Sequence, residues 1–559
     1  MTTRARVSPH VSLFRALSIL GSAGALFMAT LAVAQEPPPV GMRPVDVRRD
    51  AIVNVTLVPT PGERLADAVV LMKDGWIERV GARGSFEIPA GTTVHDGAGA
   101  TVYAGFIDAC VRLDSAAAAR AAGAEAGSHW NLKVTPQVRA ADLAPVATDA
   151  RKSLRSQGFA MAALHPDSGI FRGSSQVVLL GDDPRAARTV RADAGTSIAF
   201  ETTAGRGGDD DPEAWNRATY PGALVGSIAL VRQTLADANW HAACADAWSR
   251  NPSGNEPPQL ANALDALVPA VKGTRRAWFD ASDDRNLMRA DSIAREFSLD
   301  AGFIGSGREY RALAQVKATG RPVVVPFDFP RAPDATTPRA IEAVPLRELA
   351  HWALAPTNLA ELLRAGVPAA ASTVRLKDAG SFAKAARRAM DAGTTEDEML
   401  AALTVHPARM LGVQEIAGEV KAGRMANLVV CDGPLFGEES KVRETWIAGL
   451  RHEVEPRSRF PMKGTYALRL LEGSTTEPGK VATSVVIDAD ERTIAFLMAP
   501  PRKPEEAPDP NFKPEPVPPA AADAAKSPKA KPAPRAKAKP ARKAAARTTS
   551  SRPAPRGRR

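Results

Sequence analysis

The stretch that decides the fold is GFIDACVRLD, residues 105–114. Its first residues have the pattern of a buried β-strand, and the strand then places Cys110 and Arg112 two positions apart. Residues two apart on a strand point to the same face, so we expect the thiol and the guanidinium to lie together. Metal enzymes use this spacing to aim two ligands at one ion, but a guanidinium has no lone pair to offer a metal.

The sequence changes in character on either side of this strand. Residues 45–105 alternate short Val/Ile-rich runs with Gly turns, which is typical of antiparallel β structure. Residues 106–412 alternate short apolar runs with helical stretches, a pattern that suits a (β/α)8 barrel, and residues 413–455 return to short β runs. We therefore predict an α/β fold, a TIM-like barrel with a small composite β domain built from both ends of the barrel-bearing region. A doubly wound sheet is the alternative.

Two local signals fix positions within this outline. Lys73-Asp74-Gly75 predicts a hairpin turn in the leading β region, because glycine accepts the positive φ that such a turn requires. Near the end of the barrel region, Thr395 and Glu398 have the spacing of a helix capping box.

The N-terminus has the pattern of an export signal. Basic residues precede an apolar run that ends in the small residues Ala32-Val33-Ala34, as a secretory peptidase requires. We predict a signal peptide over 1–34, a linker over 35–44 and a periplasmic or cell-envelope location. An uncleaved membrane anchor is the alternative, although the run is rich in Ala and Gly and short for a spanning helix.

The basicity of the chain is confined to its C-terminus. The formal net charge is +10, but residues 524–559 contain thirteen Lys or Arg and no acidic residue, so the rest of the chain carries −3. We predict a β extension over 456–503 and a disordered Pro/Ala/Lys-rich tail over 504–559, which has too few large apolar residues to offset its ordering entropy. Such a tail suits anionic envelope components. No aromatic residue follows Phe512, so no specific nucleic-acid partner is expected.

The cysteine count bounds the redox and metal chemistry. Cys110, Cys244 and Cys431 are an odd number, which excludes a complete disulfide framework and leaves at least one thiol free or bridged between molecules. No CxxC pair is present, so a structural zinc site of the cysteine type is not expected.

With these motifs the sequence resembles the amidohydrolase superfamily, in particular its imidazolonepropionase-like exported members. That group begins with β runs ending in DG-x-I-x-x-VG, matched by residues 74–81, and opens its barrel with G-[LF]-I-D-x-H-x-H, matched by GFIDACVRL. It closes with T-x-[NH]-P-A-[RK]-x-L-G and G-x-[IV]-x-x-G-x-x-A-[DN]-L-V-V, matched from Thr404 and from Gly418 onward. The resemblance spans residues 45–455.

The resemblance implies metal-assisted hydrolysis of non-peptide C–N bonds. One or two divalent ions such as zinc would polarise a carbonyl and lower the pKa of a bound water. The family holds them with two His on the first barrel strand, two more on later strands and an Asp on the eighth. Here the first pair falls on Cys110 and Arg112, a later His on Asp280, another in residues 305–307, and the Asp on Val374.

These substitutions predict that the metal centre is lost. Arg112 cannot deprotonate, and its fixed charge repels a cation. Val374 removes the carboxylate that binds metal and accepts a proton. Cys110 and Asp280 alone do not supply the three protein ligands that a catalytic zinc normally has, so no cofactor is expected.

The same residues allow other roles. Arg112 is either a carboxylate anchor at the barrel mouth or half of a buried ion pair with Asp280 or Asp108, and the ion pair is favoured. Cys110 fits a small buried hydrophobe better than a nucleophile. His165 follows a strand-like run where active-site loops begin, so it is either a site residue or an ordinary loop histidine.

Three functional hypotheses follow. The first is a non-catalytic amidohydrolase-like subunit that binds a small amide-like ligand, and that pairs with a catalytic paralogue or with a second copy of itself. The second is an active hydrolase with an atypical site around Cys110, His165 and Asp280. The third is an envelope-binding protein that acts through its tail. Fold alone does not decide among them.

Overall fold

The structure is a computed structural model, and the chain divides into two compact units, Met1–Ser458 and Arg459–Arg559. The residues that it describes are 47–183, 188–202, 220–438 and 440–455, and three strands beyond them. The predicted export signal (1–34), linker (35–44) and tail (504–559) lie outside the described residues, as does most of the predicted β extension over 456–503. Among the described residues, no helix combines the length and the apolar character needed to cross a bilayer.

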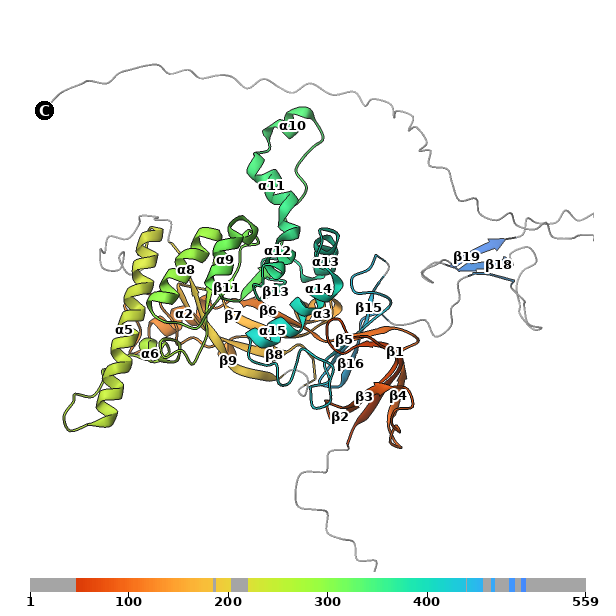
Figure 1. Cartoon of the computed structure of the whole chain (residues 1–559), viewed down its shortest axis with the longest axis horizontal. Helices are drawn as coiled ribbons and strands as arrows, with labels where there is room; N and C mark the ends of the chain where they lie inside the picture. Colours follow the sequence, from red (N-terminus) through yellow and green to blue (C-terminus); the bar gives the residue numbers. More distant parts are fainter. Residues whose placement is uncertain are drawn as a thin grey trace, which may run out of the picture. The chain divides into compact units, whose positions relative to one another are not determined.

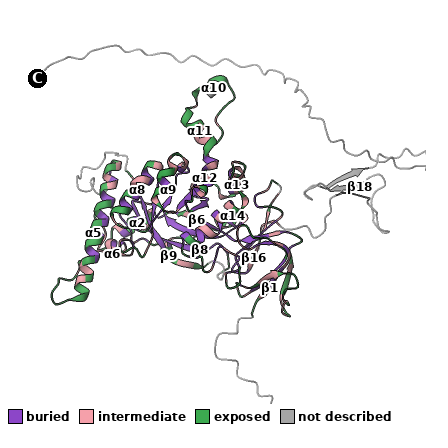
Figure 2. Cartoon of the chain, in the orientation of Figure 1, coloured by how far each residue is buried: buried purple, intermediate pink, exposed green. Residues whose placement is uncertain are grey.

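Eight strands of the first unit form a nearly closed, barrel-like sheet. They follow one another in sequence order, and the last strand packs against the first. The strands are β6 (Phe106–Leu113), β7 (Phe159–Pro166), β8 (Phe171–Leu179), β9 (Thr189–Ala199), β10 (Ala277–Asp280), β11 (Ala301–Ile304), β12 (Val323–Pro326) and β13 (Ala369–Ser372). Most of their residues are buried (Figure 2), which explains why the sequence shows short continuous apolar runs instead of alternation. The predicted mixed α/β fold with a barrel-like sheet is confirmed.

The barrel departs from the strand–helix alternation predicted from the sequence at one place. β8 runs antiparallel to both β7 and β9, whereas the other hydrogen-bonded neighbours run parallel. Only residues 167–170 connect β7 to β8. Gly169 in this turn has a φ of +95°, and a Cβ there would lie 2.8 Å from the carbonyl oxygen of Lys133. So short a turn has no room for a crossover helix, so the chain doubles back at one end of the barrel.

Helices cover the outside of the barrel sheet (Figure 1). The long helix α5 lies along one edge of this unit, and α10 and α11 form an excursion that stands away from the barrel. The helices are α2 (Ala116–Gly123), α3 (Thr148–Ser156), α5 (Leu224–Arg250), α6 (Asn262–Asp265), α7 (Val268–Val271), α8 (Asp284–Glu296), α9 (Leu313–Thr319), α10 (Pro338–Ala343), α11 (Leu346–Leu354), α12 (Asn358–Arg364), α13 (Phe382–Asp391), α14 (Glu396–Leu403) and α15 (Val405–Met410).

A second sheet combines strands from both ends of the barrel-bearing region. Its order is β16-β15-β14-β5-β1-β2-β3, with β4 paired to β1. The strands are β1 (Arg49–Val58), β2 (Leu65–Lys73), β3 (Trp76–Ala82), β4 (Thr93–Asp96), β5 (Thr101–Ala104), β14 (Leu428–Cys431), β15 (Val442–Ile447) and β16 (Leu450–Glu453). The sheet has its own small hydrophobic core, in which Trp446 is completely buried.

Both local sequence signals are confirmed. Asp74 and Gly75 have φ values of +51° and +88° and join the antiparallel strands β2 and β3. The Thr395 hydroxyl accepts a hydrogen bond from the backbone N–H of Glu398, and the Glu398 carboxylate accepts one from the backbone N–H of Thr395.

The second unit is described only as an antiparallel sheet of three strands, in the order β17-β18-β19. They are β17 (Gly464–Ala467), β18 (Ala482–Ile487) and β19 (Ile494–Met498).

Candidate functional site

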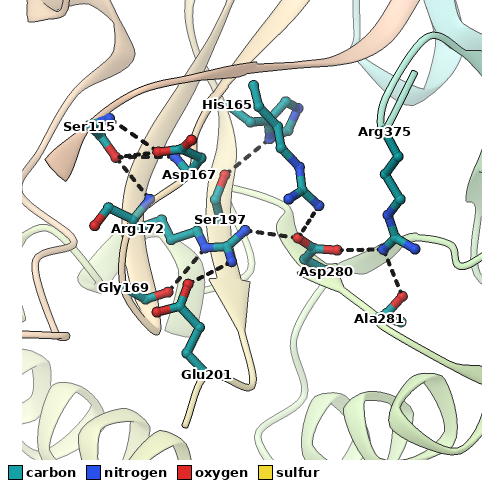
Figure 3. A network of polar contacts seen from close by, with 12 residues as sticks. Ser115, His165, Asp167, Gly169, Arg172, Ser197, Glu201, Asp280, Ala281 and Arg375 are labelled. Atoms are coloured by element: carbon teal, nitrogen blue, oxygen red, sulfur yellow. Dashed lines mark hydrogen bonds and ion pairs between the residues drawn. The ribbon is translucent and has the colours of Figure 1, made fainter. Parts of the chain in front are cut away.

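The carboxyl ends of the parallel strands place a cluster of charged side chains at one end of the barrel, which we call the mouth. Asp280, the last residue of β10, is at its centre. Its carboxylate accepts hydrogen bonds from three guanidiniums: Arg112 Nη2 at Oδ2, Arg172 Nη1 at Oδ2 (2.8 Å) and Arg375 Nη2 at Oδ1 (3.0 Å). Figure 3 shows Arg172 and Arg375 reaching Asp280 from opposite sides.

Arg172 is the most constrained of the three arginines. It is near the start of β8, so the antiparallel course of that strand is what brings it to the mouth. Its Nε donates to the carbonyl oxygen of Gly169 at 3.0 Å, and its Nη2 donates to Glu201 Oε1 at 3.0 Å. Its side chain is 9% exposed, as is that of Asp280, so this pair forms the interior of the cluster.

Arg112 and Arg375 form the outer part of the cluster. Their side chains are 35% and 23% exposed. Arg375 follows β13 and has a φ of +71°, a left-handed conformation that costs about 1–2 kcal/mol for a residue with a Cβ. Its Nη2 also donates to the carbonyl oxygen of Ala281 at 3.1 Å, which fixes the guanidinium beside Asp280.

The arginines keep Asp280 ionised. Burial alone would raise the pKa of this carboxyl group, but the charges of Arg112, Arg172 and Arg375 outweigh burial and hold the pKa below its usual value. Asp280 is therefore a fixed anion that cannot serve as a proton donor near neutral pH.

Asp108, the other partner expected for Arg112, has a different role. It is fully buried and accepts hydrogen bonds from the Ser372 and Thr373 hydroxyls and from the backbone N–H of Thr373 (3.1 Å). These bonds tie β6 to the end of β13 and so help to close the barrel. Burial raises the pKa of the Asp108 carboxyl group. The hydrogen bonds lower this pKa, but burial has the larger effect.

Cys110 lies in β6, two residues before Arg112. The register between β6 and β7 shifts between Asp108 and Val111, so Cys110 lies in an irregular part of the strand. The side chain is completely buried, and this burial raises the pKa of the thiol. The charge of Arg112 lowers the pKa in part, and the charge of Asp280 raises it. The group is therefore a protonated thiol in the core and not a thiolate.

His165 is inside the barrel and not on a loop. It is in β7, is 2% exposed, and its Nδ1 is 3.0 Å from the Ser197 hydroxyl of β9. Its Nε2 has no hydrogen-bond partner within the described part of the chain. Burial dominates and lowers the pKa of His165 to about 4, so the imidazole is neutral at pH 7.

Val374 and the segment after β11 complete the positions predicted from the sequence. Val374 is 3% exposed, and its neighbour Arg375 supplies the side chain that reaches the centre of the mouth. After β11, the Ser306 hydroxyl binds the buried carboxylate of Glu309 and offers nothing to Asp280. The structure thus brings Cys110, Arg112, His165 and Asp280 together, whereas the backbone N–H of Val374 donates to the Ser372 hydroxyl.

Sequence reasoning missed three members of this cluster: Arg172, Glu201 and Arg375. Arg375 is one residue past the position assigned to the strand-eight Asp, so a search of neighbouring positions would have found it. Arg172 and Glu201 had no such signal, because their proximity depends on the reversal of β8.

The side chains of the mouth do not fit a divalent metal of the kind that the resemblance implies. Within the described ranges, no group of three or more His, Cys, Asp or Glu side chains is arranged to hold a metal ion. The central carboxylate, Asp280, already binds three guanidiniums, whose charges repel a cation. The imidazole of His165, which pairs with Arg112 across β6 and β7, is buried and has its Nδ1 3.0 Å from the Ser197 hydroxyl.

Comparison with known proteins adds to this geometry. No protein-family model matches the chain, and no curated protein matches it. Among solved structures, an amidohydrolase from Thermotoga maritima superimposes with a TM-score of 0.58 at 22% identity, over 72% of this chain and 99% of that one. The chain has the amidohydrolase fold.

Other solved structures superimpose less well. Molinate hydrolase aligns with a TM-score of 0.41 at 14% identity, over 74% of this chain and 99% of that one. Phenylurea hydrolase B aligns with a TM-score of 0.41 at 16% identity, over 73% and 97%. The resemblance predicted from the sequence is confirmed at the level of the fold by the Thermotoga maritima structure, and a fold does not by itself carry an activity.

Proposed function

We propose that this protein is a member of the amidohydrolase superfamily whose barrel mouth binds a ligand and does not hydrolyse it. The observation that carries the proposal is the convergence of Arg112, Arg172 and Arg375 on Asp280. The cluster lies where the family's metal ions would lie by resemblance, and its guanidiniums supply fixed positive charge without a Lewis acid or a metal-bound water.

The candidate reactive groups support binding over catalysis. The Cys110 thiol is buried and its pKa is raised, so it is a poor nucleophile. Both oxygens of Asp280 accept guanidinium N–H groups, so that carboxylate has little capacity to take a proton from water. His165 is neutral, but it is buried and bound to Ser197. An active hydrolase around Cys110, His165 and Asp280 would need these contacts to break first.

Zinc titration of the full chain by calorimetry tests the proposal. We expect no tight site in the native protein, because a cation would have to displace three guanidiniums from Asp280. The triple variant Cys110→His/Arg112→His/Val374→Asp is the matched control, since it restores three ligands at the family's positions and should gain zinc affinity. Tight zinc binding by the native chain that Asp280→Ala abolishes would overturn the proposal, as would zinc-dependent hydrolysis of an amide.

We also propose a location and partners for this function. The export pattern over 1–34 suits a periplasmic or envelope protein, and the basic residues of 524–559 suit retention on an anionic surface. A non-catalytic barrel of this kind would act beside a catalytic paralogue or as a pair of identical chains. Size-exclusion chromatography with light scattering, alone and with an intact paralogue that keeps the His-x-His motif, distinguishes these arrangements. A monomer that never associates with such a paralogue would refute both.

A further inference from the structure

The mouth carries hydrogen-bond donors that its own side chains do not use. Arg112 binds Asp280 through Nη2 alone, and Arg375 binds Asp280 and the Ala281 carbonyl through Nη2 alone. A guanidinium has five N–H groups. The Nε and Nη1 groups of both arginines therefore make no hydrogen bond within the described part of the chain. These two arginines are also the exposed members of the cluster, at 35% and 23%.

The cluster also carries an excess of positive charge. Three guanidiniums face two carboxylates, Asp280 and Glu201, which leaves one positive charge unbalanced. Other charged groups close to the cluster do not remove this excess of positive charge. Asp328 is affected by the charges of Arg375, Arg308 and Arg112, and Lys133 beside Glu201 adds a further positive charge, so four arginines and one lysine face three carboxylates. An unbalanced charge that is partly withdrawn from water favours the binding of an anion.

The two exposed arginines are held in a fixed arrangement around one carboxylate. Arg112 binds one oxygen of Asp280 and Arg375 binds the other, so the two guanidiniums flank the same small group. Arg375 keeps this position despite its φ of +71°. Strained backbone of this kind persists where the surrounding structure holds it, and it is concentrated at functional sites.

We infer that the barrel mouth binds a small molecule through a carboxylate, which accepts hydrogen bonds from the unused Nε and Nη1 groups of Arg112 and Arg375. The inference rests on the proposed function and narrows it, from an amide-like ligand to one that carries a carboxylate. Each oxygen of a carboxylate can accept an N–H from a different guanidinium, so the Nε or Nη1 groups of Arg112 and Arg375 together can bind one carboxylate. Asp280 and Arg172 hold the two guanidiniums in place and are positioning residues.

Calorimetry with a matched pair of probes tests the inference. Hippurate is an amide that carries a carboxylate, and hippuramide is its neutral counterpart. We expect the full chain to bind hippurate at least about tenfold more tightly than hippuramide, with an affinity that falls as salt rises. Arg112→Gln and Arg375→Gln should each weaken hippurate binding by about tenfold or more and leave hippuramide unchanged.

Two further variants keep the test interpretable. Arg112→Lys keeps the charge and loses the planar guanidinium with its several donors, so it should recover only part of the affinity. Arg120→Gln removes an exposed charge on α2 outside the mouth and should bind hippurate as the native chain does. Equal affinity for the two probes, no binding of hippurate, acetate or succinate at millimolar concentration, or unchanged binding in both glutamine variants would overturn the inference.

The outcomes separate this inference from the proposed function. Hippurate binding that depends on Arg112, together with hydrolysis of hippurate, would support the carboxylate site and overturn the non-catalytic proposal. Absence of carboxylate binding in a chain that also binds no zinc and hydrolyses no amide would overturn only the carboxylate site.

Discussion

Replacing Asp280 with Asn is the perturbation that most sharply tests the arginine cluster. The substitution preserves the size of the side chain but removes the negative charge and replaces one acceptor oxygen with an N–H donor. Three guanidiniums would then face an amide that can accept hydrogen bonds only through its one oxygen. We expect the free energy of unfolding to fall strongly, because removing one partner of a buried ion pair leaves the others without compensation.

The size of the effect follows from the exposure of each pair. Arg172 and Asp280 are both 9% exposed, and losing one partner of a buried pair costs about 3–5 kcal/mol. Arg112 and Arg375 are 35% and 23% exposed, so solvent screens their attraction to Asp280 and each adds up to about 1 kcal/mol. We therefore expect Asp280→Asn to lower the free energy of unfolding by about 4 kcal/mol or more.

Urea unfolding followed by tryptophan fluorescence measures this change. Trp278 is fully buried in β10, two residues before Asp280, and reports on the same strand. Asp300→Asn is the matched control, because Asp300 is 46% exposed and pairs with Arg276 at the opposite end of the barrel. The control should cost about 1 kcal/mol or less. If Asp280→Asn costs no more than Asp300→Asn, the cluster does not stabilise the barrel as described.

Three further predictions concern the barrel interior, the backbone and the tail. Burial lowers the pKa of His165 from 6.5 to about 4, so the stability that its neutral form contributes is complete above pH 6.5 and is lost as pH falls from 6.5 toward 4. His165→Gln should therefore flatten the dependence of the urea midpoint on pH between 6.5 and 4. An equally steep dependence in the variant would contradict the assignment. Arg375→Gly should be more stable than Arg375→Ala by about 1 kcal/mol, since glycine accepts the φ of +71° without strain, and identical urea midpoints would refute the backbone argument. Deleting residues 506–559 should abolish retention on vesicles that contain anionic lipid, and full retention would count against a role for the tail.

The sequence was sufficient to predict the barrel-like sheet and its strands, because these depend on local patterns. The GFID stretch marks the first barrel strand, and the buried strands appear as short apolar runs because both of their faces are covered. The direction of β8 was not predictable in the same way. Its residues suit a buried strand in either direction, and only the four-residue turn containing Gly169 shows that no helix can intervene.

The candidate site was only partly predictable for a related reason. Arg112 and Asp280 could be placed because each occupies a position that the resemblance marks, and the structure joins them directly. The pattern could not show that Asp108 is committed to Ser372 and Thr373, because those contacts cross from the first barrel strand to the last. Arg172 could not be placed either, since it reaches the mouth only through the reversal of the chain.

The most direct test of the central claim is an anomalous diffraction measurement at the zinc edge, on crystals of the full chain grown with zinc in excess. The account expects no anomalous peak within coordinating distance of Asp280, with Arg112 bound to that carboxylate and with Arg172 and Arg375 bound to it as in Figure 3. A zinc peak on Asp280, with the guanidiniums displaced, would contradict it.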